Sequence, residues 1–175
     1  MQAGETIQFG DHSWQVLETA GDRAFLVSKN IVGTGSFHKE HSDVAWESCS
    51  LRKWLNGKFL KSFSPADRAR IVKTRIRNTN SPKFNTSGNG YTDDFVFLLS
   101  YDEVARFFKT NEERVATYNG AVYWWWLRTS GYTNQRAVKI KDLGGAGIYA
   151  NGYIDTPGER VTLEGGIRPA LWIKK

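Results

Sequence analysis

The sequence predicts a single α+β domain over residues 1–175, with short antiparallel strands, two or three helices and long loops. Three observations lead to this prediction. The first third of the chain alternates polar and apolar residues with a period of two, and the middle repeats apolar residues at helical spacing. The last third returns to short alternating segments separated by glycine-rich turns. The length suits one domain with a sizeable core, and no linker, repeat or low-complexity tract divides it.

The N-terminal third indicates a small antiparallel meander. We expect strands at residues 6–9, 14–17 and 24–27, because each segment alternates and polar turn residues separate them. Gly and Asp in both turns favour a tight reversal of the chain. Residues 31–42 are rich in glycine and serine, so we expect a loop there.

Residues 46–60 predict the first helix. Leu51 and Leu55 begin an apolar stripe at helical spacing, and Ser48 or Ser50 is suited to cap its start. The Asn-Gly pair that follows favours a break or an early end.

Ser64 and Pro65 predict the start of a second helix that runs to about Val72 or a little beyond, because serine caps and proline suits the first helical position. A capping box from Ser100 to Glu103 opens a third helix. Between and after these helices we expect a polar loop at 78–91, a short strand at 95–99 and an exposed connector at 111–120.

A dense aromatic run at residues 123–128 opens the last third of the chain. Short alternating segments follow it, and glycine-rich turns lie between them. We expect strands on long loops at 137–140, 147–149, 153–154 and 166–173.

The formal net charge is +6, and the basic residues are scattered along the chain. The densest basic run comprises Arg68, Arg70, Lys73, Arg75 and Arg77, and apolar residues are interleaved with it. Such a run is typical of a solvated face. Positive charge alone does not separate nucleic-acid binding from solubility.

Cys49 is the single cysteine, so an internal disulfide is excluded and we expect a buried free thiol. The first ten residues lack the regions of a signal peptide, and no apolar run approaches the roughly 18 residues of a membrane span. We therefore expect a soluble chain without a membrane span, located in the cytoplasm or associated with a phage particle or surface.

No sequence motif predicts a catalytic, metal or cofactor site. His38 and His41 share a loop with acidic residues, but their spacing matches no strong metal motif. Asp93 and Asp94 are adjacent carboxylates at a position where turn-forming acids are common. We therefore expect a non-enzyme without metal or cofactor, and a cryptic hydrolytic site on these residues is the alternative.

The strongest functional signal is a surface in the last third of the chain. Tyrosine supplies rigid amphipathic contact area, asparagine supplies adaptable hydrogen bonding, and loops on a scaffold are where binding residues gather. The candidate ligand-binding residues are Tyr132, Asn134, Gln135, Arg136, Tyr149, Asn151 and Tyr153. Alternation along the strands leaves open that Tyr149 or Tyr153 packs instead. A nucleic-acid-binding module is the other alternative, and the lack of a basic cluster beside these aromatics counts against it.

The segment W-W-W-L-R-T-S-G at residues 124–131 is followed by G-G-I-R-P-A-L-W-I at residues 165–173. This pairing resembles a bacterial and phage family of uncharacterised domains, whose C-terminal halves read W-W-L-R-S, a variable stretch and G-V-R-P-A-L-W. Upstream, residues 46–56 are similar to the family element W-x-x-S-x-L-R-x-W-L-N. Residues 7–17 resemble the family opening, and residues 97–100 with Glu103 also fit.

That family in turn looks like the C-type-lectin fold, in the branch shared with formylglycine-generating enzymes and variable proteins of diversity-generating retroelements. The resemblance implies ligand-facing loops and strands between Thr129 and Gly165. It implies a scaffold, with its arginines buried and hydrogen-bonded or paired, that contains Trp124, Trp125, Trp126, Arg128, Arg168 and Trp172.

The function implied is a non-catalytic module that recognises a protein or glycan on a cell or phage surface, including a retroelement-diversified variable protein as one form of it. The loop motifs of calcium-dependent sugar binding are missing from the sequence, so calcium is not expected. Formylglycine-generating enzymes use a cysteine pair, and Cys49 is alone, so that oxidase chemistry is disfavoured.

Overall fold

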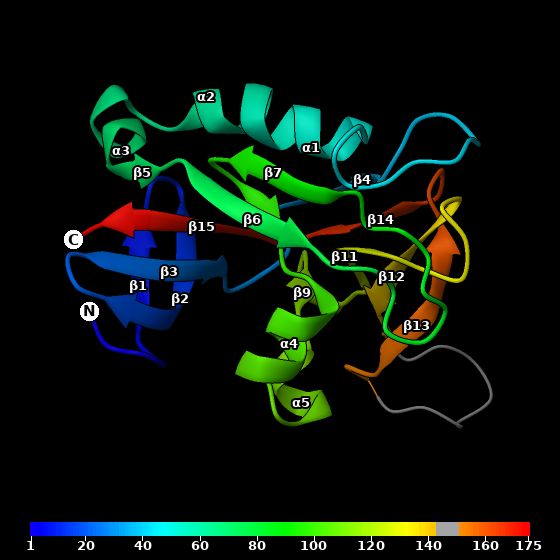
Figure 1. The fold of residues 1–175 in the computed structure, drawn as a ribbon. Helices are drawn as coiled ribbons and strands as arrows, with labels where there is room; N and C mark the ends of the chain where they lie inside the picture. Colours follow the sequence, from blue (N-terminus) through cyan, green and yellow to red (C-terminus); the bar gives the residue numbers. More distant parts are fainter. Residues whose placement is uncertain (143–150) are drawn as a thin grey trace.

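A computed structural model describes residues 1–142 and 151–175 and has an α+β fold, which confirms the predicted class (Figure 1). Strands form a six-stranded and a five-stranded sheet together with two small hairpins. Helices lie on either side of these sheets in the view of Figure 1. One cluster of buried apolar side chains extends through both large sheets and the helices that cover them.

The six-stranded sheet brings the two ends of the chain together. Its order is β1-β2-β3-β15-β5, and β8 also pairs with β15. Strand β15 (Pro169–Lys174) lies antiparallel to β3 (Arg23–Ser28), so the C-terminal strand extends the N-terminal meander. The other members are β1 (Thr6–Phe9), β2 (His12–Ala20), β5 (Ile71–Val72) and β8 (Phe97–Leu98).

The five-stranded sheet has the order β13-β12-β11-β14-β4. Its central strand β11 (Trp125–Ser130) pairs in parallel with β14 (Glu164–Ile167) and antiparallel with β12 (Arg136–Ile140). The outer strands are β4 (Gly33–Ser36) and β13 (Ile154–Arg160). The aromatic run and the C-terminal motif therefore lie on neighbouring strands.

Two glycines allow β14 to approach the tryptophan run closely. A Cβ on Gly165 would lie 2.3 Å from the Trp124 ring and 2.6 Å from Nε1 of Trp126. A Cβ on Gly166 would lie 2.5 Å from the carbonyl oxygen of Trp124. Non-bonded carbon atoms pack at about 3.5–4.0 Å, so only glycine fits at these positions without displacing its neighbours.

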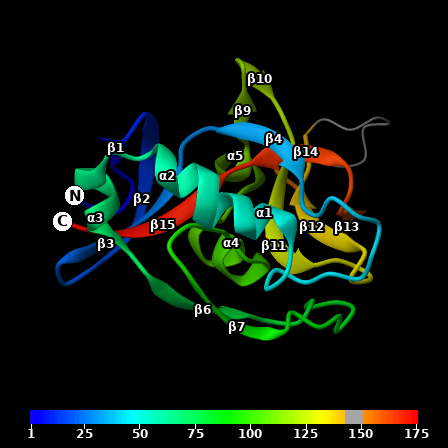
Figure 2. The same cartoon turned by 90° about the horizontal axis from the view of Figure 1, so that it is seen from above.

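A long helix, interrupted by one π-helical turn, crosses above the sheets (Figure 2). It consists of α1 (Ser50–Trp54), the π turn η1 (Leu55–Phe59) and α2 (Leu60–Ser62). Asn56 Nδ2 donates to the carbonyl oxygens of Arg52 and Val96, and Oδ1 accepts from the N–H groups of Phe95 and Val96. The Asn-Gly pair therefore lies in the widened turn of the helix, which Asn56 ties to the two residues that precede β8, and it does not end the helix.

Three further helices and two hairpins complete the described chain. The helices are α3 (Pro65–Arg70), α4 (Tyr101–Phe107) and α5 (Asn111–Arg114). The hairpins join β6 (Thr74–Asn78) to β7 (Gly90–Asp94) and β9 (Thr117–Tyr118) to β10 (Ala121–Val122). Among the described residues, no helix combines the length and the apolar character needed to cross a bilayer.

Several predicted elements need correction. The expected loop at 31–42 contains β4, because its small residues pair with β14 along four positions from Gly33 to Ser36. The second helix ends at Arg70, since the next residues leave the helix to pair with β15. Neither predicted serine caps α1, because the side chain of Cys49 accepts from the N–H group of Arg52 instead.

The middle of the chain also holds more regular structure than expected. Part of the predicted connector at 111–120 forms the helix α5, which begins with a capping box. If α1, η1 and α2 are taken as one helix, the described chain has four helices, whereas two or three were expected. The predicted loop at 78–91 ends in β7. The predicted strand at 147–149 lies outside the described residues, and the one at 153–154 marks the start of β13.

Candidate functional site

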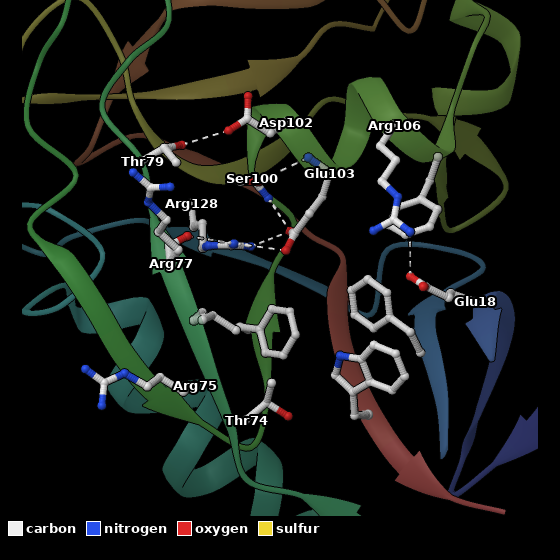
Figure 3. A pocket seen from close by; sticks show the side chains of 15 residues that line it. Glu18, Thr74, Arg75, Arg77, Thr79, Ser100, Asp102, Glu103, Arg106 and Arg128 are labelled. Atoms are coloured by element: carbon white, nitrogen blue, oxygen red, sulfur yellow. Dashed lines mark hydrogen bonds and ion pairs between the residues drawn. The ribbon is translucent and has the colours of Figure 1, made fainter. Parts of the chain in front are cut away.

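A groove of about 410 Å³ opens between β6 and α4 (Figure 3). Its volume lies in the range of ligand-binding clefts, about 300–1,000 Å³. Its walls come from one edge of the β6–β7 hairpin and from α4, and its floor comes from β3, β8 and β15. The lining residues are Glu18, Phe25, Thr74, Arg75, Ile76, Arg77, Thr79, Phe97, Ser100, Asp102, Glu103, Arg106, Phe107, Arg128 and Trp172.

Stacked aromatic rings form the floor of the groove. The ring of Phe25 stacks on Trp172 at 5.0 Å between centroids and on Phe97 at 5.8 Å. Phe107, from α4, meets Phe25 edge-on at 5.7 Å. Strand pairing sets this arrangement, because Phe25 and Trp172 are direct cross-strand partners in β3 and β15. Trp172 and Phe107 keep part of their surface exposed, so the floor offers an aromatic contact to a ligand.

Strand β6 presents an edge, and not a face, to the groove. Residues from Thr74 to Arg77 line it consecutively, whereas a strand face would contribute only every second residue. Within the described residues, β6 pairs with β7 alone, so its other edge carries no strand. Such an edge displays backbone N–H and C=O groups that an added strand can bind.

Helix α4 is held in place at the opposite wall by one buried arginine. The side chain of Ser100 accepts from the N–H group of Glu103, and the Glu103 carboxylate accepts from the Ser100 N–H group. Both carboxylate oxygens of Glu103 also accept from the guanidinium of Arg128, at 2.5 and 3.0 Å. Arg128 further donates to the carbonyl oxygens of Leu98 and Arg77. It therefore links β11, α4, β8 and β6 around one end of the groove.

The remaining charges of the groove divide into paired and unpaired groups. Arg106 forms an ion pair with Glu18 at 3.1 Å. Asp102 accepts from the neutral hydroxyl of Thr79 at 3.0 Å and forms no ion pair with the described residues. Arg75 and Arg77 are exposed and form no ion pair within the described part of the chain. The β6 wall therefore carries the uncompensated positive charge.

The predicted ligand-binding surface begins in the loop before β12. Tyr132 is 61% exposed and meets Phe84 edge-on at 5.1 Å. Asn134 Nδ2 donates to the carbonyl oxygen of Ser87, while the backbone carbonyl oxygen of Asn134 accepts from the N–H group of Val44. Gln135 is half-buried, and its backbone carbonyl oxygen accepts from the N–H group of Val161. Arg136 donates from Nη1 to the carbonyl oxygen of Gly158.

Asn151 and Tyr153 lie at the other end of the same hairpin. Arg136 pairs with Arg160 and Ile140 pairs with Ile154, so the strands β12 and β13 separate the two groups. Four residues of strand span about 13 Å. Both residues are half-buried, and Tyr149 lies outside the described residues. The structure therefore brings Tyr132, Asn134, Gln135 and Arg136 together, but it does not bring Asn151 and Tyr153 to them.

The scaffold residues of the resemblance occupy different environments. Trp125 and Trp126 are fully buried, and their indole N–H groups donate to the carbonyl oxygens of Arg114 and Gly35. Trp124 is half-buried. Trp172 is half-buried and contributes to the groove floor.

Arg168 differs from Arg128 because it forms no ion pair with a carboxylate of residues 1–142 or 151–175. It is 2% exposed and lies over the rings of Trp125 and Phe108 at 4.8 and 5.2 Å. Nε donates to the carbonyl oxygen of Ser28, while Nη1 has no partner among the described residues. Burial lowers the pKa of the guanidinium to about 10.

The residues named for a cryptic hydrolytic site do not form a cluster. His38 Nδ1 bonds with Ser50, and His41 is exposed. Asp94 is fully buried and accepts from Trp46 Nε1, Arg52 Nε and Thr92 Oγ1, whereas Asp93 is exposed. Within the described residues, no group of three or more histidine, cysteine, aspartate or glutamate side chains is arranged to hold a metal.

Sequence reasoning missed the groove because its walls come from segments assigned to other structures. The sequence predicts a solvated face for the basic run that contains Arg75 and Arg77, and it predicts only a helix for the segment of α4. One signal was present: the segment T-R-I-R-N at residues 74–78 alternates with a period of two and indicates a strand.

Comparisons with known proteins assign a family but no activity. Residues 21–175 match a family described as "Domain of unknown function (DUF6273)". The match contains the tryptophan run, the C-terminal motif and the whole groove except Glu18, while residues 7–17 precede it. Searches of curated proteins and of solved structures found no match. The chain belongs to the DUF6273 family of domains.

Proposed function

We propose that this domain is a non-catalytic recognition module that binds an extended polypeptide in the groove between β6 and α4. The observation that carries the proposal is the run of consecutive β6 residues along the groove wall. An unpaired strand edge beside a concave surface is the geometry of peptide binding by strand addition. Affinity then comes from main-chain hydrogen bonds, and specificity comes from the adjacent side chains.

The chemistry of the groove supports recognition. Tryptophan, tyrosine and arginine dominate binding energy at protein interfaces. The groove has the part-exposed rings of Trp172 and Phe107 on its floor and Arg75 and Arg77 on one wall. The aromatic floor and the arginine-bearing strand β6 thus border one concavity. Tyr132, in the C-terminal loop, is 61% exposed and does not line this groove.

The state of the groove carboxylates supports a non-catalytic role. Glu103 is bound by Arg128 and by the helix cap, Glu18 is paired with Arg106, and Asp102 accepts from Thr79. A general base or nucleophile needs a free reactive atom within reach of a substrate. Glu103 and Glu18 are instead paired with arginines, and Asp102 accepts a hydrogen bond from Thr79 through one oxygen.

The C-type-lectin-like architecture is a further part of the proposal. It is supported by the adjacency of β11 and β14, since the two motifs that carry the resemblance meet there. A retroelement-diversified role would place the variable positions between Thr129 and Gly165. In that case the loop around Tyr132 would act as a second binding surface, separate from the groove.

One observation favours nucleic acid as a second candidate ligand. The guanidinium of Arg75 lies 5.0 Å from the ring of Tyr91, which is 55% exposed. Interleaved basic and aromatic side chains are typical of single-strand binding. A fluorescent oligothymidine titration at two salt concentrations tests this candidate, because binding to phosphates weakens steeply with salt.

The proposal can be tested by blocking one surface at a time. Cys49 is buried and unreactive, so a bulky maleimide can be attached selectively at an introduced cysteine. Thr74→Cys blocks the groove, Tyr132→Cys blocks the C-terminal loop, and exposed Ala66→Cys on α3 is the matched control. Each labelled protein is tested for binding of peptides selected from a random display library on the unmodified domain, and for binding on a glycan array.

We expect selected peptides to bind the Ala66 and Tyr132 conjugates and to lose binding to the Thr74 conjugate. Loss only in the Tyr132 conjugate would move the site to the C-terminal loop and contradict the groove. Binding of glycans but of no peptide would contradict the polypeptide ligand.

A further inference from the structure

We infer that the groove takes an antiparallel strand with the side-chain pattern acidic–apolar–acidic, docked on the edge of β6 opposite Arg75 and Arg77. This inference rests on the proposed function and specifies its ligand. It combines the direction of the β6 backbone groups, the alternation of the β6 side chains and the charge left unpaired on this wall.

The backbone of β6 has a defined pair of groups for docking. The carbonyl oxygen of Arg77 accepts from Nη2 of Arg128 at 3.2 Å, so it points toward the groove and away from β7. Polar backbone groups of alternate strand residues point to the same side. The N–H and C=O groups of Arg75 therefore also face the groove. Since no strand of the described chain pairs there, these two groups are available to an incoming strand.

Side-chain alternation along β6 determines the pattern of the ligand. Arg75 and Arg77 are exposed on the outer face of the hairpin, while Ile76 between them is 6% exposed and faces inward. Directly opposed residues in an antiparallel pair place their side chains on the same face. Residues opposite the two arginines therefore face outward, and the residue between them faces the aromatic floor at Phe97 and Trp172.

The charges on this wall select acidic residues for the outward positions. Arg128 and Arg106 already have carboxylate partners, whereas Arg75 and Arg77 have none in the described chain. Asp93 is the cross-strand partner of Arg75 on β7, yet the two form no ion pair, and the Asp93 carbonyl accepts from Arg52. Opposite charges across an antiparallel pair are favourable, and like charges are unfavourable.

The groove is short because its far end is closed. The hydroxyl of Thr79 donates to Asp102, and Arg128 occupies the Arg77 carbonyl oxygen (Figure 3). A docked strand therefore gains main-chain hydrogen bonds mainly at Arg75. A three-residue core, with its apolar residue on the aromatic floor, fills the remaining length from Thr74 to Arg77.

The experiment uses a fluorescent, end-capped pentapeptide, Thr-Glu-Phe-Glu-Thr, titrated against the full chain by fluorescence anisotropy. Three relatives of this probe are titrated in parallel. One replaces both glutamates with lysine. One is N-methylated at the two glutamates, whose N–H groups face β6 in an antiparallel pair. One is N-methylated at phenylalanine, whose N–H group faces away.

Two protein variants are compared with the parent chain. One is the double variant Arg75→Gln with Arg77→Gln. The other is Arg160→Gln, which changes a matched exposed arginine on the edge strand β13.

We expect the parent peptide and the phenylalanine-methylated peptide to bind, and the lysine and glutamate-methylated peptides not to bind. The double arginine variant should weaken binding about tenfold, since each cross-strand ion pair contributes up to roughly a fivefold change. Arg160→Gln should leave binding unchanged. Both arginines of the double variant are exposed, so its thermal unfolding should match that of the parent chain.

Other outcomes overturn the inference in distinguishable ways. Strand addition in this register would be excluded if both methylated peptides lose binding equally, or if both bind as well as the parent peptide. Equal binding of the lysine peptide would exclude acidic selectivity. A library-selected peptide without acidic residues that binds the unmodified domain but not the Thr74→Cys conjugate would support the proposed function and refute this inference. Binding of oligothymidine that is lost in the double arginine variant would assign the wall to nucleic acid. Failure of all peptides, library included, would refute both proposals.

Discussion

Arg128 on β11 and Glu103 on α4 form a two-point ion pair in which each carboxylate oxygen accepts from a different nitrogen of the guanidinium. The Arg128 side chain is 3% exposed, and that of Glu103 is 25% exposed. Because Glu103 also completes the capping box of α4, the pair connects the start of this helix to β11, the central strand of the five-stranded sheet. One wall of the groove is thus positioned by a residue of the tryptophan-run motif.

Breaking this pair should destabilise the fold strongly. Glu103→Gln leaves the buried charge of Arg128 uncompensated, which typically costs about 3–5 kcal/mol. Urea unfolding measures this loss. Arg106→Gln is the control, because it removes the exposed pair with Glu18, and exposed pairs contribute about 1 kcal/mol or less. Equal losses in the two variants would show that burial does not govern the Arg128 pair.

Removing the charge of Arg168, in the C-terminal motif, should not lower the free energy of unfolding. Arg168 is buried, pairs with no carboxylate in the part of the chain that the structure describes, and has a pKa that burial lowers to about 10. Replacing a buried ion pair by apolar side chains of similar size is often neutral or stabilising by about 1–4 kcal/mol. A buried arginine without a carboxylate partner lacks even the Coulomb attraction that offsets desolvation in such a pair. We therefore expect Arg168→Met to keep or raise the free energy of unfolding, whereas Arg128→Met lowers it.

Thermal and urea unfolding of these two methionine variants test this contrast. A loss of several kcal/mol in Arg168→Met would show that the contacts with Trp125 and Phe108, and the bond to Ser28, outweigh the cost of desolvation.

The glycine pair of the C-terminal motif should not tolerate a methyl group. In Gly165→Ala the new Cβ would overlap the Trp124 ring, and overpacking of this kind costs about 1–3 kcal/mol. Gly57→Ala is the matched control, because nothing lies within 4 Å of its Cβ position and it sits inside a helix. Alanine there should stabilise by about 0.5–1 kcal/mol. Similar urea midpoints for both variants would contradict the close packing of β14 on Trp124.

The thiol of Cys49 should make the fold less stable at high pH. Burial raises its pKa from 9.0 to about 12. Between these values the unfolded chain loses a proton that the folded chain retains. The free energy of unfolding therefore falls as pH rises through this window, by about 1.4 kcal/mol per pH unit. Below pH 9 both states keep the proton, so no dependence arises from this group.

Urea unfolding of the parent chain and of Cys49→Ala between pH 8 and 11 isolates this contribution. The alanine variant loses the sulfur that caps α1, so it starts less stable at pH 8. The difference between the two proteins should shrink as pH rises. A constant difference would show that the thiol does not titrate as described.

The elements that could be predicted are those whose signals are local. The meander, the start of α3 at Ser64 and the capping box at Ser100 follow from alternation and from caps, which act over a few residues. Strand β4 could not be predicted in this way, because its G-T-G-S segment becomes a strand only through pairing with β14. The role of Gly165 could not be predicted for the same reason, because it depends on contact with Trp124, which is distant in sequence.

The groove could not be predicted because it depends on which edges remain unpaired. Alternation at residues 74–78 indicates a strand, but that β6 pairs with β7 alone among the described strands is a property of the assembled sheets. Trp172 is a C-terminal motif residue and also part of the groove floor, and sequence reasoning gave it the first role alone. The pattern of Tyr and Asn residues located a polar loop but not the distance that β12 and β13 place between its two halves.

The most direct test of a peptide site in the groove is an amide NMR titration of the isotope-labelled domain with Thr-Glu-Phe-Glu-Thr. We predict that the largest shift changes fall on the amides of Thr74 to Arg77 and on the indole N–H of Trp172, with no change at the amides of residues 132–136. Changes confined to residues 132–136 would place recognition on the C-terminal loop and contradict the central claim.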